Sequence, residues 1–259
     1  MPRIALAEIV AYLDKRLDTA GTPDYTGALN GLQVENRQPI ERVAVAVDAS
    51  LAAIDGAINS KAQLLIVHHG LFWSGVAALR GSAYERIRRL ISADLAVYSS
   101  HLPLDRHPEL GNNALLARRL GLDPQLPFAR YQDISVGVAG DCDMDTARIA
   151  ERLDEFTRGF GGHLVTVGVA EGRRTRRWAL CTGAGASSDS LREARELGVD
   201  TLIVGEGPHH TGVEAMDTGM AILYAGHYAT ETLGVQAVGE ELTRQFGLPW
   251  SFISAPTGL

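Results

Sequence analysis

Three short stretches of the chain carry side chains that bind divalent metals, and each follows an apolar run or stands at a glycine-marked helix start. They are LLIVHHG with His68 and His69, VYSSHLPLD with His101 and Asp105, and ILYAGHYATE with His227 and Glu231. Imidazole and carboxylate ligands suit zinc, iron or manganese, and no cysteine is among them. Because clefts of α/β folds open at the carboxyl ends of strands, side chains from separate segments can converge there.

Each stretch also has a plainer interpretation. Adjacent residues of a regular strand face opposite sides, so His68 and His69 reach one cleft only if the strand ends there, where Gly70 lets the backbone turn. Otherwise one histidine belongs to the core and the other is exposed.

The other two stretches are equally open when each is taken alone. Pro103 argues against a helix between His101 and Asp105, so we expect a loop, in which the acid can instead satisfy turn amides. His227 and Glu231 stand four residues apart at a helix start and share one face. The alternative there is a solvated helix end with an acid in its first turn. Taken together, the three stretches favour a metal centre, because burying so many ionisable groups without a cation costs several kcal/mol per ion.

Composition narrows the class of protein. The chain has 259 residues, 46% of them hydrophobic and 21% charged, which suits one large or two modest α/β domains. A formal net charge of -7 argues against nucleic acid or an anionic membrane as the main partner. Cys142 and Cys181 are expected to be small buried hydrophobes of a protein in a reducing compartment. No signal peptide or membrane-spanning run is legible, so we expect a cytoplasmic protein.

Helical and strand patterns alternate along the first half, which predicts a largely parallel sheet with helices on its faces. The predicted helices span residues 4–17, 50–60, 82–92 and 112–120, and the predicted strands span 42–50, 62–70 and 94–101. The stretch 121–128 has two prolines and is interpreted as a boundary. We therefore predict an N-terminal α/β domain at 1–126 and a second α/β domain at 127–259.

The second half continues the alternation. Strands are predicted at 134–141, 200–206 and 220–227, and helices at 144–156, 188–198 and 229–246, the last of which leads to LPWSFIS (248–254). The segment 163–185 predicts two strands joined by a basic hairpin turn with Arg173, Arg174, Arg176 and Arg177, interpreted as solvated. Ser188 or Asp189 is expected to cap the helix that Gly198 ends. The C-terminal segment is expected to return ligands to a metal-binding cleft between the two domains.

Several longer motifs match a known family. They are NGLQV (30–34), LLIVHHGLFW (64–73), SSHLPLD (99–105) with GNN (111–113), VGEGPHH (204–210) and AGHYATE (225–231). The chain resembles the Nif-three-like dinuclear metal-centre proteins, which are widely named GTP cyclohydrolase I type 2 homologs. The resemblance runs from about residue 30 to 235. It departs at the early motif, where relatives often have WDNVGLQVG; ALNGLQVEN lacks the Trp and Asp, so no role of that Asp is carried over.

The resemblance implies the Nif-three-like fold, a homo-oligomer that is a hexamer, and two divalent metal ions per subunit. Carried over by motif, the metal ligands are His68, His69, Asp105, His227 and Glu231. Glu231 is the expected bridge between the ions, and His101 lies in or next to the ligand shell.

We therefore expect a metal-dependent hydrolase acting on a nucleotide such as GTP or on a phosphoester. Two ions can polarise the substrate and lower the pKa of a bound water. His101 and Glu206 are the expected proton carriers, and Glu206, His209 and His210 can line a substrate pocket. The alternative is a non-catalytic metal-binding scaffold or regulatory interaction protein. A nucleotide-binding module built on the Gly183–Gly185 loop is the third hypothesis.

Overall fold

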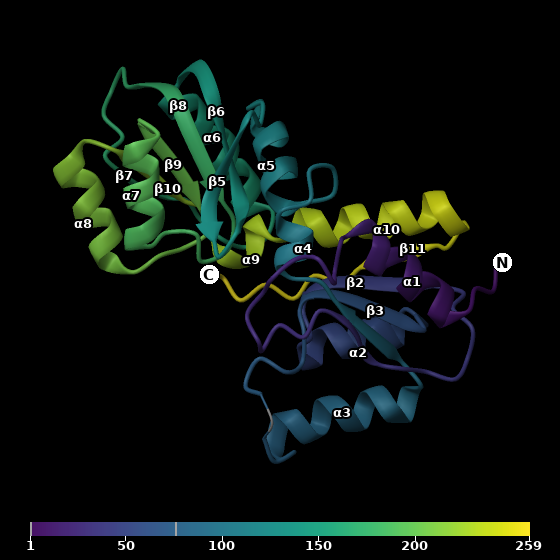
Figure 1. The fold of residues 1–259 in the computed structure, drawn as a ribbon. Coiled ribbons are helices and arrows are strands. Elements are labelled where there is room, and N and C mark those ends of the chain that lie inside the picture. The colour runs from purple at the N-terminus through teal and green to yellow at the C-terminus, as the bar shows by residue number, and fades with distance from the viewer. Residues whose placement is uncertain (1, 76) are drawn as a thin grey trace. The chain divides into compact units, whose positions relative to one another are not determined.

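The computed structural model describes residues 2–75 and 77–259, and the chain divides into two compact units (Figure 1). Unit 1 comprises the chain up to Leu104 together with Gly234–Ala255. Unit 2 comprises Asp105–Leu233 and Pro256–Leu259. Each unit has its own sheet flanked by helices, as the predicted α/β class requires.

The division differs from the one that the prolines suggested. Helix α5 (Asn112–Leu120) goes with unit 2, because the Asn113 amide donates a hydrogen bond of 3.0 Å to the Val136 carbonyl. The proline stretch is not a bare linker, since strand β5 begins at Leu126. The segment Gly234–Ala255 goes with unit 1, because strand β11 (Trp250–Phe252) joins the sheet of that unit.

The sheet of unit 1 has the strand order β1-β4-β3-β2-β11. Its strands are β1 (Gly31–Val34), β2 (Val43–Asp48), β3 (Leu64–His69), β4 (Ala96–Ser99) and β11. Strands β4, β3, β2 and β11 are parallel to their neighbours, and β1 is antiparallel to β4. Strands β2 and β3 have five buried residues in a row, as expected of strands covered on both faces. The parallel order brings the carboxyl ends of β2, β3 and β4 to one edge.

Helices α1 (Leu6–Arg16), α2 (Leu51–Asn59), α3 (Gly81–Ala93) and most of α10 (Thr232–Phe246) belong to unit 1. The Ser50 side chain caps α2 by accepting from the Ala53 N–H. Buried Ile54 of α2 and Leu90 of α3 form one apolar cluster with alternate residues of β3, Leu65 and Val67. That cluster fixes where β3 ends.

The sheet of unit 2 has the order β5-β6-β8-β9-β10-β7. Its strands are β5 (Leu126–Tyr131), β6 (Ile134–Asp145), β7 (Val165–Val167), β8 (Arg174–Cys181), β9 (Thr201–Val204) and β10 (Ala221–Tyr224). Strands β8, β9 and β10 are parallel, whereas β5 and β6 at one edge and β7 at the other are antiparallel.

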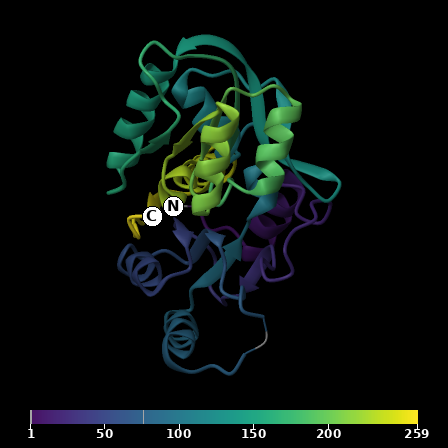
Figure 2. The same ribbon diagram turned by 90° about the vertical axis from the view of Figure 1, so that its left-hand side faces the viewer.

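Alternate residues of β8 pack on opposite faces of this sheet. Trp178 and Leu180 join a cluster with α5 and α6 (Thr146–Arg158), and Ala179 and Cys181 join a cluster with α7 (Ser188–Glu196) and α8 (His209–Thr218). Figure 2 shows the light-green helices α7 and α8 next to each other. Both faces are covered, so residues at the carboxyl ends of β8, β9 and β10 are held by a rigid layer.

Two local predictions were wrong. Residues 102–105 form a short helix, α4 (Leu102–Asp105). Pro103 is tolerated there because the N–H groups in the first turn of a helix have no acceptor within the helix, so the N–H that proline lacks is not needed. The basic segment is not a hairpin, because β7 pairs with β10 rather than with β8.

Two arginines of the basic segment pair with acids while their side chains stay exposed, so the expectation of a solvated segment holds although the hairpin does not. Arg174 and Arg177 are on β8 and form ion pairs with Asp143 and Asp141, each at 2.6 Å. The N-cap of α7 is Ser187 rather than Ser188 or Asp189.

No helix in the described part of the chain is long and apolar enough to cross a membrane.

Glu241 of α10 is the polar link between α10 and α1. Its side chain is 6% exposed and accepts hydrogen bonds from Tyr12 at 2.5 Å and Arg16 at 3.1 Å, and it also pairs with Arg244. Burial works to raise the pKa of Glu241, but the bonds from Tyr12 and Arg16 and the charge of Arg244 outweigh it and hold the pKa below its ordinary value.

Replacing this carboxylate should lower the free energy of unfolding. Because the folded pKa is depressed, the stabilisation is present above the unfolded pKa of about 4.3 and is lost as pH falls through the folded value. Glu241→Gln should cost about 1–3 kcal/mol at pH 7 in urea unfolding, and the difference from the parent should shrink below about pH 4. The exposed neighbour Glu240 gives the control Glu240→Gln, which should change little. Equal losses in the two variants would contradict this account.

Candidate metal centre

Three histidine rings of unit 1 gather at the carboxyl edge of its sheet. His68 and His69 end β3, and His101 follows β4. One ligand nitrogen from each ring lies within 4.8 Å of the other two, so the group could hold a metal ion. Adjacent histidines both reach this group because the strand, and with it the alternation of side chains, ends at His69.

The NGLQV motif holds the two loops that carry these rings. The Asn30 side-chain oxygen accepts the His101 backbone N–H at 2.8 Å, and the Gln33 side-chain oxygen accepts the Leu71 N–H at 2.7 Å. A Cβ at Gly70 would lie 2.2 Å from the Gln33 amide, so only glycine permits that approach. The Gln33 side chain thus occupies the space that a larger residue at position 70 would need, whereas the backbone of Gly70 has no positive φ that would require glycine.

The hydrogen bond at His68 fixes which of its nitrogens can bind a metal. Its Nδ1 lies 2.9 Å from the Ser100 carbonyl oxygen. A carbonyl can only accept, so Nδ1 carries the proton and the Nε2 of the neutral ring has the lone pair. His68 is fully buried.

His69 and His101 repeat this arrangement with carboxylates. Their Nδ1 atoms each lie 2.9 Å from a carboxylate oxygen, that of Asp48 and that of Asp24 respectively. Metal-bound histidines commonly donate their second N–H to a carboxylate or carbonyl, which fixes the tautomer and turns the ring toward the ion. All three histidines of unit 1 therefore present Nε2.

Asp24 is a candidate site residue that the sequence patterns do not predict. It lies in the loop before β1, its side chain is 6% exposed, and its second oxygen accepts from the Asn30 amide and the Leu102 N–H. Burial works to raise the pKa of Asp24, but the bonds from His101, Asn30 and Leu102 hold the pKa below its ordinary value. The carboxylate thus stays charged beside His101. No local pattern announces it, since 77 residues separate the two side chains.

Asp48 was also missed, although the sequence contained a signal for it. It is the last residue of β2 and stands opposite His69 in the register of two parallel strands. An acid at the carboxyl end of the strand next to a histidine-terminated strand is placed to bond that histidine.

Unit 2 has a second group, around His227 and Glu231. The short helix α9 (His227–Thr230) and its cap residue Glu231 put the two side chains on one face, and Nε2 of His227 lies 3.2 Å from the Glu231 carboxylate. Nδ1 of His227 lies 2.8 Å from Glu206. Burial works to lower the pKa of His227, but Glu231 and Glu206 outweigh it and raise the pKa to about 9.

The side chain of Glu231 occupies the space that a side chain at Gly183 would need. A Cβ there would lie 2.1 Å from Oε1 of Glu231, and the φ of Gly183 is +61°. At Gly185 a Cβ would lie 2.2 Å from the Cys181 carbonyl. Close packing thus explains the glycines of the Gly183–Gly185 loop, and the nucleotide-loop hypothesis gains nothing from them.

Asp105 is the other buried acid of unit 2. The residue is 5% exposed, and one of its oxygens accepts from the Asn112 amide at 2.9 Å and the Thr182 hydroxyl at 3.4 Å. The next residue of the GNN motif, Asn113, accepts the Thr182 N–H at 2.8 Å. Burial, and then the charges of Asp105 and Glu231, raise the pKa of the Cys181 thiol well above its usual range. Cys181 is thus an unreactive buried residue, as the sequence suggested.

The two expected proton carriers both stand next to candidate ligands. His101 belongs to the histidine group of unit 1, and Glu206 accepts from His227. His209 and His210 begin α8 and are exposed, with His210 3.3 Å from the Ser188 hydroxyl. His107 differs from the other buried histidine: its Nδ1 accepts two backbone N–H groups, so its proton is on Nε2 and it is a structural residue.

Comparison with known proteins assigns the chain to a family. The model of Duf34/NIF3 (NGG1p interacting factor 3) matches residues 4–257. The chain belongs to this family. A relative from Deinococcus radiodurans named "GTP cyclohydrolase 1 type 2 homolog" is 39% identical over 254 residues, covering 97% of this chain and 94% of the relative.

Solved structures agree with that assignment. A structure titled "Structural genomics, protein ybgI, unknown function" superposes with a TM-score of 0.88 at 32% identity and covers all of both chains. The protein TTHA1606 from Thermus thermophilus superposes with a TM-score of 0.81 at 34% identity, covering 99% of this chain and 100% of that one. The family resemblance and the fold class inferred from the motifs are therefore confirmed.

Gly183→Ala should destabilise the metal-free protein more than the matched change Gly198→Ala. Both glycines have a positive φ, of +61° and +70°, but only Gly183 is packed against Glu231, whereas a Cβ at Gly198 would meet open space. Gly198→Ala should cost about 1 kcal/mol through backbone strain, and Gly183→Ala about 1–3 kcal/mol more through overpacking. Urea unfolding of both variants after chelation checks this, and equal losses would show that Glu231 is not held against the loop.

Proposed function

We propose that this protein binds two divalent metal ions through the Nε2 atoms of His68, His69 and His227 and the carboxylates of Asp105 and Glu231, with Glu231 as the bridge. One observation carries the proposal: each of these histidines, and His101 as well, has an oxygen acceptor on Nδ1. These pairs leave the Nε2 atoms of His68, His69 and His227 to serve as ligands, and His101, held in the same way, lies beside them.

The chemistry of the donors agrees with a first-row metal. Imidazole nitrogen with carboxylate oxygen suits zinc, iron or manganese, whereas magnesium and calcium prefer all-oxygen shells. Glu231 and Asp105 are both buried, and a buried carboxylate needs a counter-charge. His227 supplies part of it in the metal-free chain, where its raised pKa keeps the ring protonated at neutral pH.

We further propose that the bound metal supports hydrolysis of a nucleotide or phosphoester. When bound, such ions polarise a substrate oxygen and lower the pKa of a bound water. Asp24 and Glu206 hold the rings of His101 and His227 in one tautomer. Glu206 and His101 are the proposed proton carriers, because Glu206 accepts a hydrogen bond from the candidate ligand His227, and His101, bonded to Asp24, lies beside His68 and His69. The names of relatives such as the Deinococcus radiodurans protein support a purine nucleotide as the substrate class.

A second function is favoured by one finding. The matched family is described by an interacting factor, which supports a non-catalytic metal-binding scaffold or regulatory protein. In that case the ions stabilise an oligomer, for which the proposed state is a hexamer. Removal of the metal by a chelator distinguishes the two functions. A hydrolase should lose only its turnover, whereas a scaffold should lose its assembly or its thermal stability.

Metal analysis of the freshly purified protein tests the ligand set. The parent should contain two ions per chain, and Glu231→Gln should lose both because the bridge is neutralised. Asp48→Asn should weaken metal binding about 10- to 100-fold, since it removes the acceptor that orients His69. His163→Ala, at an exposed position, is the control and should keep both ions. Full metal content in Glu231→Gln would overturn the proposal.

Turnover separates the hydrolase from the scaffold. Protein loaded with zinc, iron or manganese should hydrolyse GTP or a member of a phosphoester panel, and Glu206→Gln should lower kcat at least tenfold while keeping the oligomer. The oligomer is measured by native mass spectrometry. A metal-loaded protein that turns over nothing in the panel, and whose oligomer dissociates on chelation, would favour the scaffold.

A further inference from the structure

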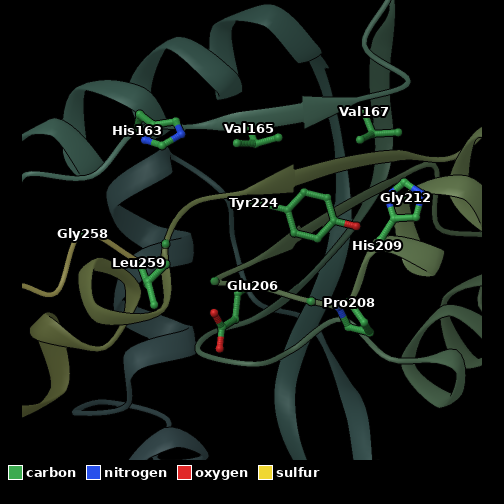
Figure 3. A pocket seen from close by; sticks show the side chains of 13 residues that line it. His163, Val165, Val167, Glu206, Pro208, His209, Gly212, Tyr224, Gly258 and Leu259 are labelled. Carbon is green, nitrogen blue, oxygen red and sulfur yellow. The ribbon is translucent and has the colours of Figure 1, made fainter.

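A pocket of about 400 Å³ lies within unit 2, with Glu206 on its wall. That volume falls in the range of small-molecule sites. Its lining comes from β7, from the end of β10, from the segment between β9 and the start of α8, and from the C-terminal residues Gly258 and Leu259. The side chains that matter below are Val165, Val167, Tyr224, Glu206 and His209 (Figure 3). The metal-ligand proposal leaves this pocket without a role.

The apolar wall is flat and open. Val165 and Val167 are two apart on β7 and so face the same side, and Tyr224 stands directly opposite Val165 in the register of β10 and β7. Val165, on this edge strand of the sheet, is 48% exposed and so open to a ligand. Figure 3 shows the Tyr224 ring between the two valines and the Glu206 carboxylate. Such a slot suits a planar ring.

The hydrogen bonds around Tyr224 make its oxygen an acceptor. The Thr211 hydroxyl donates to the Pro208 carbonyl at 2.7 Å, so its one proton is committed. The Tyr224 hydroxyl, 2.7 Å from the Thr211 oxygen, must then donate its own proton to Thr211. What Tyr224 offers to the pocket is therefore a lone pair.

Glu206 adds a second acceptor. One of its oxygens receives the His227 Nδ1–H, and the side chain is 45% exposed on the pocket side. An ionised carboxylate only accepts hydrogen bonds, and its charge repels phosphate. The imidazoles of His163 and His209 can donate or accept, so they fit either kind of ligand. The two acceptors, Glu206 and Tyr224, both require a donor on the ligand.

We propose that this pocket binds a planar nitrogen heterocycle that presents N–H donors, such as a guanine-type ring, with Glu206 and Tyr224 as the specificity-determining acceptors. The ring stacks along Val165, Val167 and Tyr224, and any phosphate of the ligand lies outside the pocket. The assignment of this ring to the hydrolysed substrate rests on the function proposed above. The binding of the ring itself is independent of that function.

Calorimetry with guanosine and inosine on chelated protein tests the pocket. Inosine lacks the exocyclic amino group of guanosine, so it should bind about tenfold or more weakly, the loss expected for one hydrogen bond to a charged acceptor. Glu206→Gln should reduce that preference, and Tyr224→Phe should weaken guanosine severalfold while keeping the stacking ring. Equal binding of the two nucleosides, or no binding of guanosine up to millimolar concentration, would overturn the proposal.

A matched pair of valines controls for general damage. Val165→Ser should weaken guanosine binding severalfold, whereas Val213→Ser, on α8 outside the pocket lining and 46% exposed, should leave it unchanged. Equal effects of the two changes would also overturn the pocket. Metal content is measured on the same preparations before chelation. A protein that contains two ions but does not bind guanosine refutes only the pocket. A protein that binds guanosine but contains no metal when freshly purified refutes only the metal-centre proposal.

Discussion

The hydrogen bond at histidine Nδ1 is the constraint on which the rest of the candidate site depends. An imidazole has two nitrogens, and a ring whose Nδ1–H is held by an oxygen can offer a metal only Nε2. His68 meets a backbone carbonyl, and His69, His101 and His227 meet carboxylates. The backbone that delivers those acceptors is therefore as much a part of the site as the rings.

The two sheets supply that backbone in the same way. In unit 1, parallel register sets Asp48 at the end of β2 beside His69 at the end of β3. In unit 2, the loop after β9 carries Glu206 to His227, which follows β10. Residues at the carboxyl ends of neighbouring parallel strands become neighbours in space, whatever their distance along the chain. Gly70 and Gly183 also shape the site. Because glycine has no Cβ, the polar side chain of Gln33 can approach Gly70, and that of Glu231 can approach Gly183.

Much of this could be predicted from the sequence. The apolar run before His68 predicts a strand, and the i,i+4 spacing of His227 and Glu231 predicts a helical turn. Both patterns depend only on neighbouring residues, and the structure contains both elements. Asp24 could not be predicted, because its bond to His101 closes a long loop and no spacing rule reports it. The pairing of β7 with β10 was missed for the same reason: which edge a short strand joins is decided by tertiary packing. A helix at Pro103 was wrongly excluded, because proline disrupts the interior of a helix but is tolerated in its first turn, where Pro103 lies.

The most direct test of the account is the protonation and metal-binding state of the individual imidazole nitrogens, observed by ¹⁵N NMR of the zinc-loaded protein. We predict that His68, His69, His101 and His227 keep a proton on Nδ1, while the Nε2 resonances of the proposed ligands His68, His69 and His227 shift on zinc binding. We also predict that His107 keeps its proton on Nε2 with or without zinc, since its Nδ1 accepts backbone N–H groups. Zinc-induced shifts at Nδ1 of the proposed ligands, or no shift at either of their nitrogens, would contradict the account.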